Sequence, residues 1–185
     1  VGFEVDLGVA VAAEIEDIRD LVIEGSERAI VLEMPYTGWP VYIEETIFRL
    51  SLAGFVPVLA HPERNERVQK SSDLLLSCLR SGAVAQATGG SLGGAFGRAA
   101  VRTFERLFSE GLISLVASDA HAHRVAGWTL EPVFAALEGV LTIDELVTLT
   151  TSNPAELLAG KAPRPIVPSA PAENRHGRSW LPKLR

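Results

Sequence analysis

The chain is poor in cysteine, in long apolar runs and in positive charge. Cys78 is the only cysteine and falls on the apolar stripe of an expected helix, which excludes a disulfide framework or a thiolate metal site within the chain. No apolar run approaches the roughly 20 residues of a membrane span, and we expect a cytoplasmic protein without such a span. With 23 acidic and 17 basic side chains, the chain lacks the basic footprint of nucleic-acid partners.

Charge and proline divide the chain into a body and a tail. The last 24 residues hold five of the basic side chains, one of the acidic ones and five of the 11 prolines. They show no sustained apolar period, so we expect residues 162–185 to be a disordered basic tail and residues 1–161 to be the single domain. The first residues read as a strand already in progress, and we expect sequence upstream of Val1 to be missing.

Short apolar runs alternate with helical periods along the body. Five runs bounded by polar residues predict buried strands, at residues 2–7, 28–34, 55–60, 82–88 and 112–118. Glycines stand where the intervening helices should end, at Gly25, Gly54, Gly82 and Gly111. Repeated units of this kind predict a parallel sheet, open or closed into a barrel. A closed barrel takes about 250 residues, so the chain would lack its first βα units.

Near the end of the body, Asn153 and Pro154 match the cap and the first residue of a short closing helix that stops at Gly160.

Two polar clusters follow buried runs, at the places where parallel strands carry active sites. They are Ala60-His61-Pro62-Glu63-Arg64 and Ser118-Asp119-Ala120-His121. Asp119 and His121 are two residues apart and therefore share one face. Imidazole with carboxylate oxygens suits Zn, Mn or Fe ions, and Arg64 is placed to meet an anionic substrate. Together these residues predict a metal site.

Each of these residues alone is also compatible with a structural role. His61 matches a hydrogen-bonded core histidine, and Asp119 matches a helix or loop cap. Glu4 inside the first strand is equally compatible with an outward position. Glu63 and Glu66 are expected to be surface or helix-start charges.

A serine hydrolase is a rival interpretation, and a cysteine phosphatase is excluded. Gly89-Gly90-Ser91-Leu92-Gly93 follows a strand and matches the nucleophile motif of α/β-hydrolases, with Asp119 and His121 later in the chain. Two residues so close in sequence would point side by side, which disfavours a triad. Val84 stands six residues after Cys78, where a cysteine phosphatase loop requires arginine.

Taken in order, the motifs resemble those of the PHP (polymerase and histidinol phosphatase) superfamily. They are Gly2-x-Glu4, Ala60-His61-x-Glu63-Arg64, Ala117-Ser118-Asp119-x-His121 and Asn153-Pro154. Within the superfamily, the chain is most similar to the manganese-dependent tyrosine-protein phosphatases of bacterial capsule and exopolysaccharide operons. The resemblance spans residues 1 to about 160 and implies a distorted, TIM-like (β/α)7 barrel whose first units are absent here.

The resemblance also implies a site. Glu4, His61, Asp119 and His121 would bind two or three Mn²⁺ ions, and Arg64 and Arg124 would bind the phosphoryl group. The His-x-His motif that opens the family pattern is absent, so the site would be incomplete in this chain.

The reaction that the resemblance implies is hydrolysis of phosphotyrosine on a protein by attack of a metal-bound hydroxide. The implied partner is the substrate protein, such as an autophosphorylating bacterial tyrosine kinase. Hydrolysis of a small monoester such as histidinol phosphate, an inactive fragment and a homo-oligomer stay open as alternatives.

Overall fold

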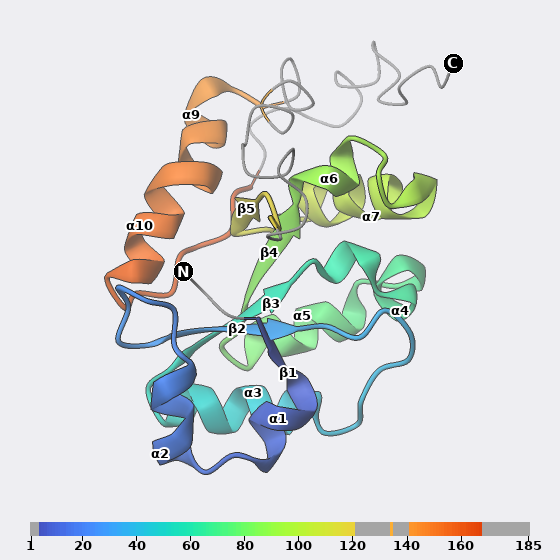
Figure 1. The fold of residues 1–185 in the computed structure, drawn as a ribbon. Coiled ribbons are helices and arrows are strands. Elements are labelled where there is room, and N and C mark those ends of the chain that lie inside the picture. The colour runs from blue at the N-terminus through green and yellow to red at the C-terminus, as the bar shows by residue number, and fades with distance from the viewer. Residues whose placement is uncertain (1–3, 121–133, 135–140, 168–185) are drawn as a thin grey trace.

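The computed structural model describes residues 4–120, 134 and 141–167 (Figure 1). Five strands form one parallel sheet in chain order: β1 (Glu4–Asp6), β2 (Ala29–Glu33), β3 (Val56–Ala60), β4 (Val84–Thr88) and β5 (Leu115–Ala117). Each lies inside a range predicted from an apolar run. The predicted α/β fold with a parallel sheet is therefore confirmed.

Helices fill the connections between successive strands. Those before β3 are α1 (Leu7–Ala12), α2 (Ile15–Ile18), the 3-10 turn η1 (Arg19–Leu21) and α3 (Ile43–Leu52). Those between β3 and β5 are the 3-10 turn η2 (Pro62–Arg64), α4 (Glu66–Lys70), α5 (Asp73–Arg80), α6 (Gly89–Leu92) and α7 (Gly97–Ser109). Beyond β5 lie α9 (Ile143–Val147), the π-helical segment η4 (Thr148–Ser152) and α10 (Asn153–Leu158). Among the described residues, no helix is long and apolar enough to cross a bilayer.

Three of the four predicted helix ends are confirmed by backbone conformation, whereas Gly25, with φ of +87°, lies four residues after Leu21, the last residue of η1. Gly54, Gly82 and Gly111 follow α3, α5 and α7 with φ of +89°, +109° and +66°, the left-handed region that favours glycine. At Gly82, an added Cβ would also lie 2.5 Å from Ser51 Oγ, so that position excludes a side chain on two grounds.

Two local predictions are corrected. The first strand ends at Asp6 rather than at residue 7, because the Asp6 carboxylate accepts hydrogen bonds from Gly8 N and Val9 N and starts α1. Asn153 caps no helix, since it continues the π-helical segment η4 directly into α10. Its amide instead donates to Ser114 O at 2.7 Å and to Arg164 O at 2.9 Å, which ties α10 to the start of β5.

The two faces of the sheet differ in their cover. Strand residues such as Ile30, Leu32 and Leu59 pack with apolar residues of the helices in the larger core, where Cys78 is also buried as predicted. The opposite face carries a smaller cluster of short apolar side chains: Ala29, Val31, Val56, Val58, Ala60, Val84, Leu115 and Leu157. Glu4 pairs in parallel register with Val31 and so lies on this second face.

The sheet curls toward this second face. In a flat sheet, four strand spacings would separate β1 from β5 by about 19 Å. Ligand atoms of Glu4 on β1 and of Asp119, just beyond β5, nevertheless lie within 4.8 Å of each other. Within the described residues β1 and β5 do not pair, so the sheet is open, and the expected (β/α)7 barrel is not seen as a closed barrel in this chain.

Candidate metal centre

His61 lies at the point where β3 leaves the sheet. Its backbone is left-handed, with φ 38° and ψ 51°, an uncommon conformation for a residue with a side chain. The peptide N–H donates to Gln86 O on β4 at 2.7 Å, and the ring is buried and stacked on Tyr36 with the centroids 5.8 Å apart. The strained turn therefore fixes the imidazole at the carboxyl end of the sheet.

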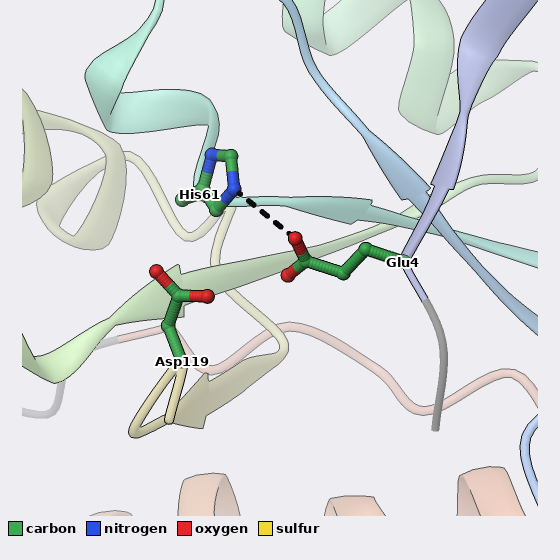
Figure 2. A group of neighbouring side chains, drawn as sticks. All are labelled: Glu4, His61 and Asp119. Carbon is green, nitrogen blue, oxygen red and sulfur yellow. Dashed lines mark ion pairs between the residues drawn. The ribbon is translucent and has the colours of Figure 1, made fainter. Parts of the chain in front are cut away.

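Glu4 and Asp119 reach the same point from the two edges of the sheet. Glu4 Oε2 lies 3.7 Å from His61 Nε2, and ligand atoms of all three residues lie within 4.8 Å of one another. Figure 2 shows the two carboxylates and the imidazole directed toward a common centre. Asp119 has φ 54°, so the described non-glycine residues with positive φ are both members of this cluster.

This donor set fits a divalent cation. Two carboxylates and an imidazole are the ligand types that Zn, Mn and Fe ions accept, and the three come from separate elements that the fold brings together. His61 Nδ1 is buried without a hydrogen-bond partner among the described residues. Of the ligands predicted from the sequence, Glu4, His61 and Asp119 are thus brought together, while His121 lies outside the described residues.

Arg64 lies beside this cluster, three residues after His61. Its Nη1 donates to Asp119 Oδ2 at 2.9 Å and its Nη2 to the Tyr36 hydroxyl at 2.6 Å. The side chains of Arg64 and Asp119 are 14% and 7% exposed, so the pair is largely shielded from solvent. A guanidinium in this position puts a positive charge next to the candidate metal ligands. Arg124, the other predicted arginine, lies outside the described residues.

Glu63 was predicted to be a surface or helix-start charge; it does stand in the first turn of η2, but a surface position is wrong. The side chain is fully buried, and its Oε1 accepts from Thr88 N at 2.9 Å and from Ser91 Oγ at 2.6 Å. Burial raises the pKa of Glu63, against the smaller lowering effect of these two hydrogen bonds. Glu63 lies in η2, two residues after the left-handed His61, and its carboxylate ties η2 to the end of β4 and to α6.

The same contacts disfavour the serine hydrolase alternative. Ser91 is fully buried, and its hydroxyl donates to a carboxylate rather than to a histidine. A triad nucleophile has to face the substrate and be activated by a base. The Gly89–Gly93 motif therefore serves this structure as a buried anchor for Glu63.

Sequence reasoning also missed Asn65. Its buried side chain accepts from Arg67 N and Val68 N and so caps α4, while its amide donates to Pro35 O at 2.6 Å and Gly38 O at 3.0 Å. Asparagine at this place is a recognisable cap signal. Its second function, holding the loop after β2, depends on a contact with residues almost 30 positions away.

A cavity of about 220 Å³ lies at the carboxyl ends of β1 and β2. Glu33, Tyr36 and Tyr42 contribute to its walls, and Tyr36 also contacts Arg64. Arg64 and the three candidate ligands do not line this cavity, so Tyr36 is its link to the centre.

Fold and site together define a class: an α/β protein of consecutive βα units with a carboxylate and imidazole cluster at the carboxyl end of its parallel sheet. The chain belongs to the family described as capsular polysaccharide synthesis, CpsB/CapC, whose sequence model matches residues 1–159. The resemblance inferred from the motifs is thereby confirmed.

Two relatives illustrate the similarity. The chain is 36% identical over 140 residues to the protein named tyrosine-protein phosphatase YwqE of Bacillus subtilis, a match covering 76% of this chain and 54% of that protein. A solved structure from work on YwqE and on CpsB of Streptococcus pneumoniae, described as metal-dependent tyrosine phosphatases, matches with a TM-score of 0.75 and 30% identity. That match covers 90% of this chain and 67% of the other. The chain spans about half the length of the curated relatives it matches.

Proposed function

We propose that the protein is a metal-dependent phosphatase that hydrolyses phosphotyrosine on proteins and regulates capsular or exopolysaccharide synthesis. The observation that carries the proposal is the convergence of Glu4, His61 and Asp119 on one point, with the Arg64 guanidinium bonded to one of these ligands. The family description and the names of the relatives support the reaction and the capsule role.

In this proposal Glu4, His61 and Asp119 hold the cation, together with His121. We propose manganese, on the resemblance of the motifs. A bound ion of this kind acidifies water at neutral pH. Arg64 binds the phosphoryl oxygens and stabilises the charge that they develop, with Arg124 as a second contact. Phenolate, with a pKa of about 10, is a good leaving group, so the site needs no strong general acid.

We also propose a setting for this activity. The substrate is a phosphotyrosine protein, an autophosphorylating bacterial tyrosine kinase in particular, and the reaction takes place in the cytoplasm. The curvature that brings β1 and β5 together supports a further proposal, that additional βα units close the sheet into a (β/α)7 barrel in a longer protein.

The test is hydrolysis by the full-length protein with and without added Mn²⁺, followed as phosphate release. We expect a phosphotyrosyl peptide to be cleaved much faster than a phosphoseryl peptide or an alkyl monoester of histidinol-phosphate type. EDTA should abolish the activity, and His61→Ala should remove both metal and activity. Preference for the alkyl monoester would instead support the second candidate, a small-molecule phosphoesterase. Unchanged metal content and activity in His61→Ala would refute the proposed site.

A further inference from the structure

The Arg64 guanidinium contacts two aromatic rings. Its Cζ is 4.0 Å from the centroid of the Phe96 ring and 4.6 Å from that of Tyr36. Both distances are within the range of cation–π contact. Tyr36 follows β2, Arg64 follows β3 and Phe96 follows α6, so three separate loops meet at this group. No role assigned above uses either ring.

Tyr36 contacts both Arg64 and His61. Its hydroxyl accepts from Arg64 Nη2 at 2.6 Å, and its ring stacks on His61 at an interplanar angle of 19°. The Tyr36 hydroxyl and the Asp119 carboxylate each accept a hydrogen bond from one terminal nitrogen of Arg64. These two bonds limit rotation of the guanidinium group. Tyr36 therefore couples the arginine to the metal-binding histidine.

The glycine-rich segment after β4 explains the position of Phe96. A Cβ added at Gly90 would lie 3.0 Å from Phe96 Cε2, so the ring occupies the space that a side chain there would fill. Gly94 and Gly97 flank Phe96 with φ of +80° and +85°. The segment is thus shaped to bring this ring against Arg64, a use that the hydrolase motif does not account for.

We propose that Tyr36 and Phe96 are positioning residues that clamp Arg64 through their ring contacts and keep its donor edge on the metal centre. This inference rests on the proposed function, in which Arg64 binds the phosphoryl group. An arginine side chain has several rotatable bonds, and a fixed guanidinium loses less conformational freedom when it meets the transition state. The clamp acts on the arginine and does not touch the reacting atoms.

Kinetics of ring variants give the first test, in the full-length, Mn²⁺-loaded protein. Phe96→Leu keeps an apolar side chain but removes the π face, and we expect kcat to fall about tenfold with KM for a phosphotyrosyl peptide nearly unchanged. Phe96→Tyr restores the ring and should recover most of this loss. Phe48→Ala on α3, an exposed ring elsewhere, serves as the control and should leave kcat unchanged. Equal losses in Phe96→Leu and Phe96→Tyr would overturn the clamp.

Chemical rescue separates positioning from general packing. Arg64→Ala empties the space beside the two rings, and added guanidinium chloride at millimolar concentration should bind there and restore part of the activity. In Arg64→Ala combined with Phe96→Leu, the guanidinium concentration needed should rise about tenfold, whereas Arg64→Ala with Phe48→Ala should respond like Arg64→Ala alone. Rescue that is the same in both double variants would contradict the proposal.

A measurement without substrate distinguishes this inference from the proposed function. In protein labelled with ¹⁵N-arginine, the Arg64 side chain should show slowed rotation of its terminal nitrogens, and Phe96→Leu should reduce the slowing, although the hydrogen bonds to Asp119 and Tyr36 stay in place. Slow rotation that is reduced in Phe96→Leu, in a protein that cleaves no phosphate ester, would refute the phosphatase and leave the clamp standing. Freely rotating nitrogens in an active wild-type enzyme would refute the clamp alone.

Discussion

The two turns that supply the candidate metal ligands are built differently. The His61 turn (residues 61–65) is held by its own backbone, since Arg64 N donates to His61 O and Asn65 N to Pro62 O. The Asp119 turn (residues 118–120) shares the left-handed conformation of its ligand, but the Asp119 carboxylate is bonded by Arg64 from the other turn. The His61 turn is thus a scaffold that holds itself in place. The position of the Asp119 carboxylate depends on Arg64, a side chain of that scaffold.

This difference implies an order of dependence between the turns. Glu63, fully buried under the His61 turn, connects it to β4 and α6, and Asn65 connects it to the loop after β2. A change in the His61 turn should therefore alter the stability of the fold, whereas a change in the Asp119 turn should alter metal binding with little effect on stability.

The largest expected effect comes from Asp119→Asn. It removes one carboxylate ligand and the counter-charge of Arg64, and we expect Mn²⁺ to bind at least about 100-fold more weakly, the upper end of what outer-shell changes cost. Isothermal titration of the full-length protein measures this loss. Asp73→Asn on the exposed start of α5 is the matched control and should bind as the wild type does. Equal affinities in the two variants would show that Asp119 is no ligand.

Glu63→Ala should have the largest effect on stability. It leaves Thr88 N and the Ser91 hydroxyl without their buried acceptor and opens a cavity, which together lower the free energy of unfolding by about 3 kcal/mol. Glu63→Gln keeps an acceptor oxygen and should lose less, and Glu66→Ala, an exposed neighbour, should change stability by about 0.5 kcal/mol at most. Urea unfolding of the three variants provides the comparison. If Glu63→Ala lowered the free energy of unfolding no more than Glu66→Ala does, the buried carboxylate would not stabilise the His61 turn.

Asn65→Ala tests whether the His61 turn also holds the loop after β2. We expect a loss of about 2 kcal/mol, because the variant loses both the helix cap and the two hydrogen bonds to Pro35 O and Gly38 O. Thr142→Ala removes an exposed cap that makes no such loop contact with the residues that the structure describes, and it should cost about 1 kcal/mol. The difference between the two, measured by urea unfolding, reports the loop contacts. Equal losses would mean that Asn65 acts as a cap only.

The strands and the residues at their ends were easier to predict from the sequence than the buried contacts around His61. Apolar runs locate all five strands, because buried parallel strands need continuous apolar residues. His61 and Asp119 could be found because strand ends of parallel sheets gather functional side chains. The burial of Glu63 could not, since it follows from a left-handed residue at position 61, a conformation that no sequence period encodes.

Contacts between loops that are distant in the sequence could not be predicted either. Tyr36 and Phe96 lie 60 positions apart and both contact Arg64, so no local pattern indicates the pair. Asn153 carries a cap signal, but a hydrogen bond to Ser114 O, 39 residues away, decides its place. The seven-stranded barrel came from the family resemblance alone, and the open sheet of the described residues shows only its curvature.

The smallest expected effect concerns the glycine-rich segment that connects the scaffold to Phe96. Gly90→Ala places a methyl group 3.0 Å from a ring that already packs on Arg64, and we expect a loss of stability of about 1 kcal/mol. At Gly93 an added Cβ would meet its nearest neighbour, Gly90 O, at 3.7 Å, an ordinary contact, so Gly93→Ala is the matched control and should be neutral or slightly stabilising. Thermal unfolding separates the two variants. The contrary result is a Gly90→Ala variant as stable as Gly93→Ala that binds Mn²⁺ and phosphate equally well. That result would show that Phe96 can move without consequence and that its ring does not require glycine at position 90.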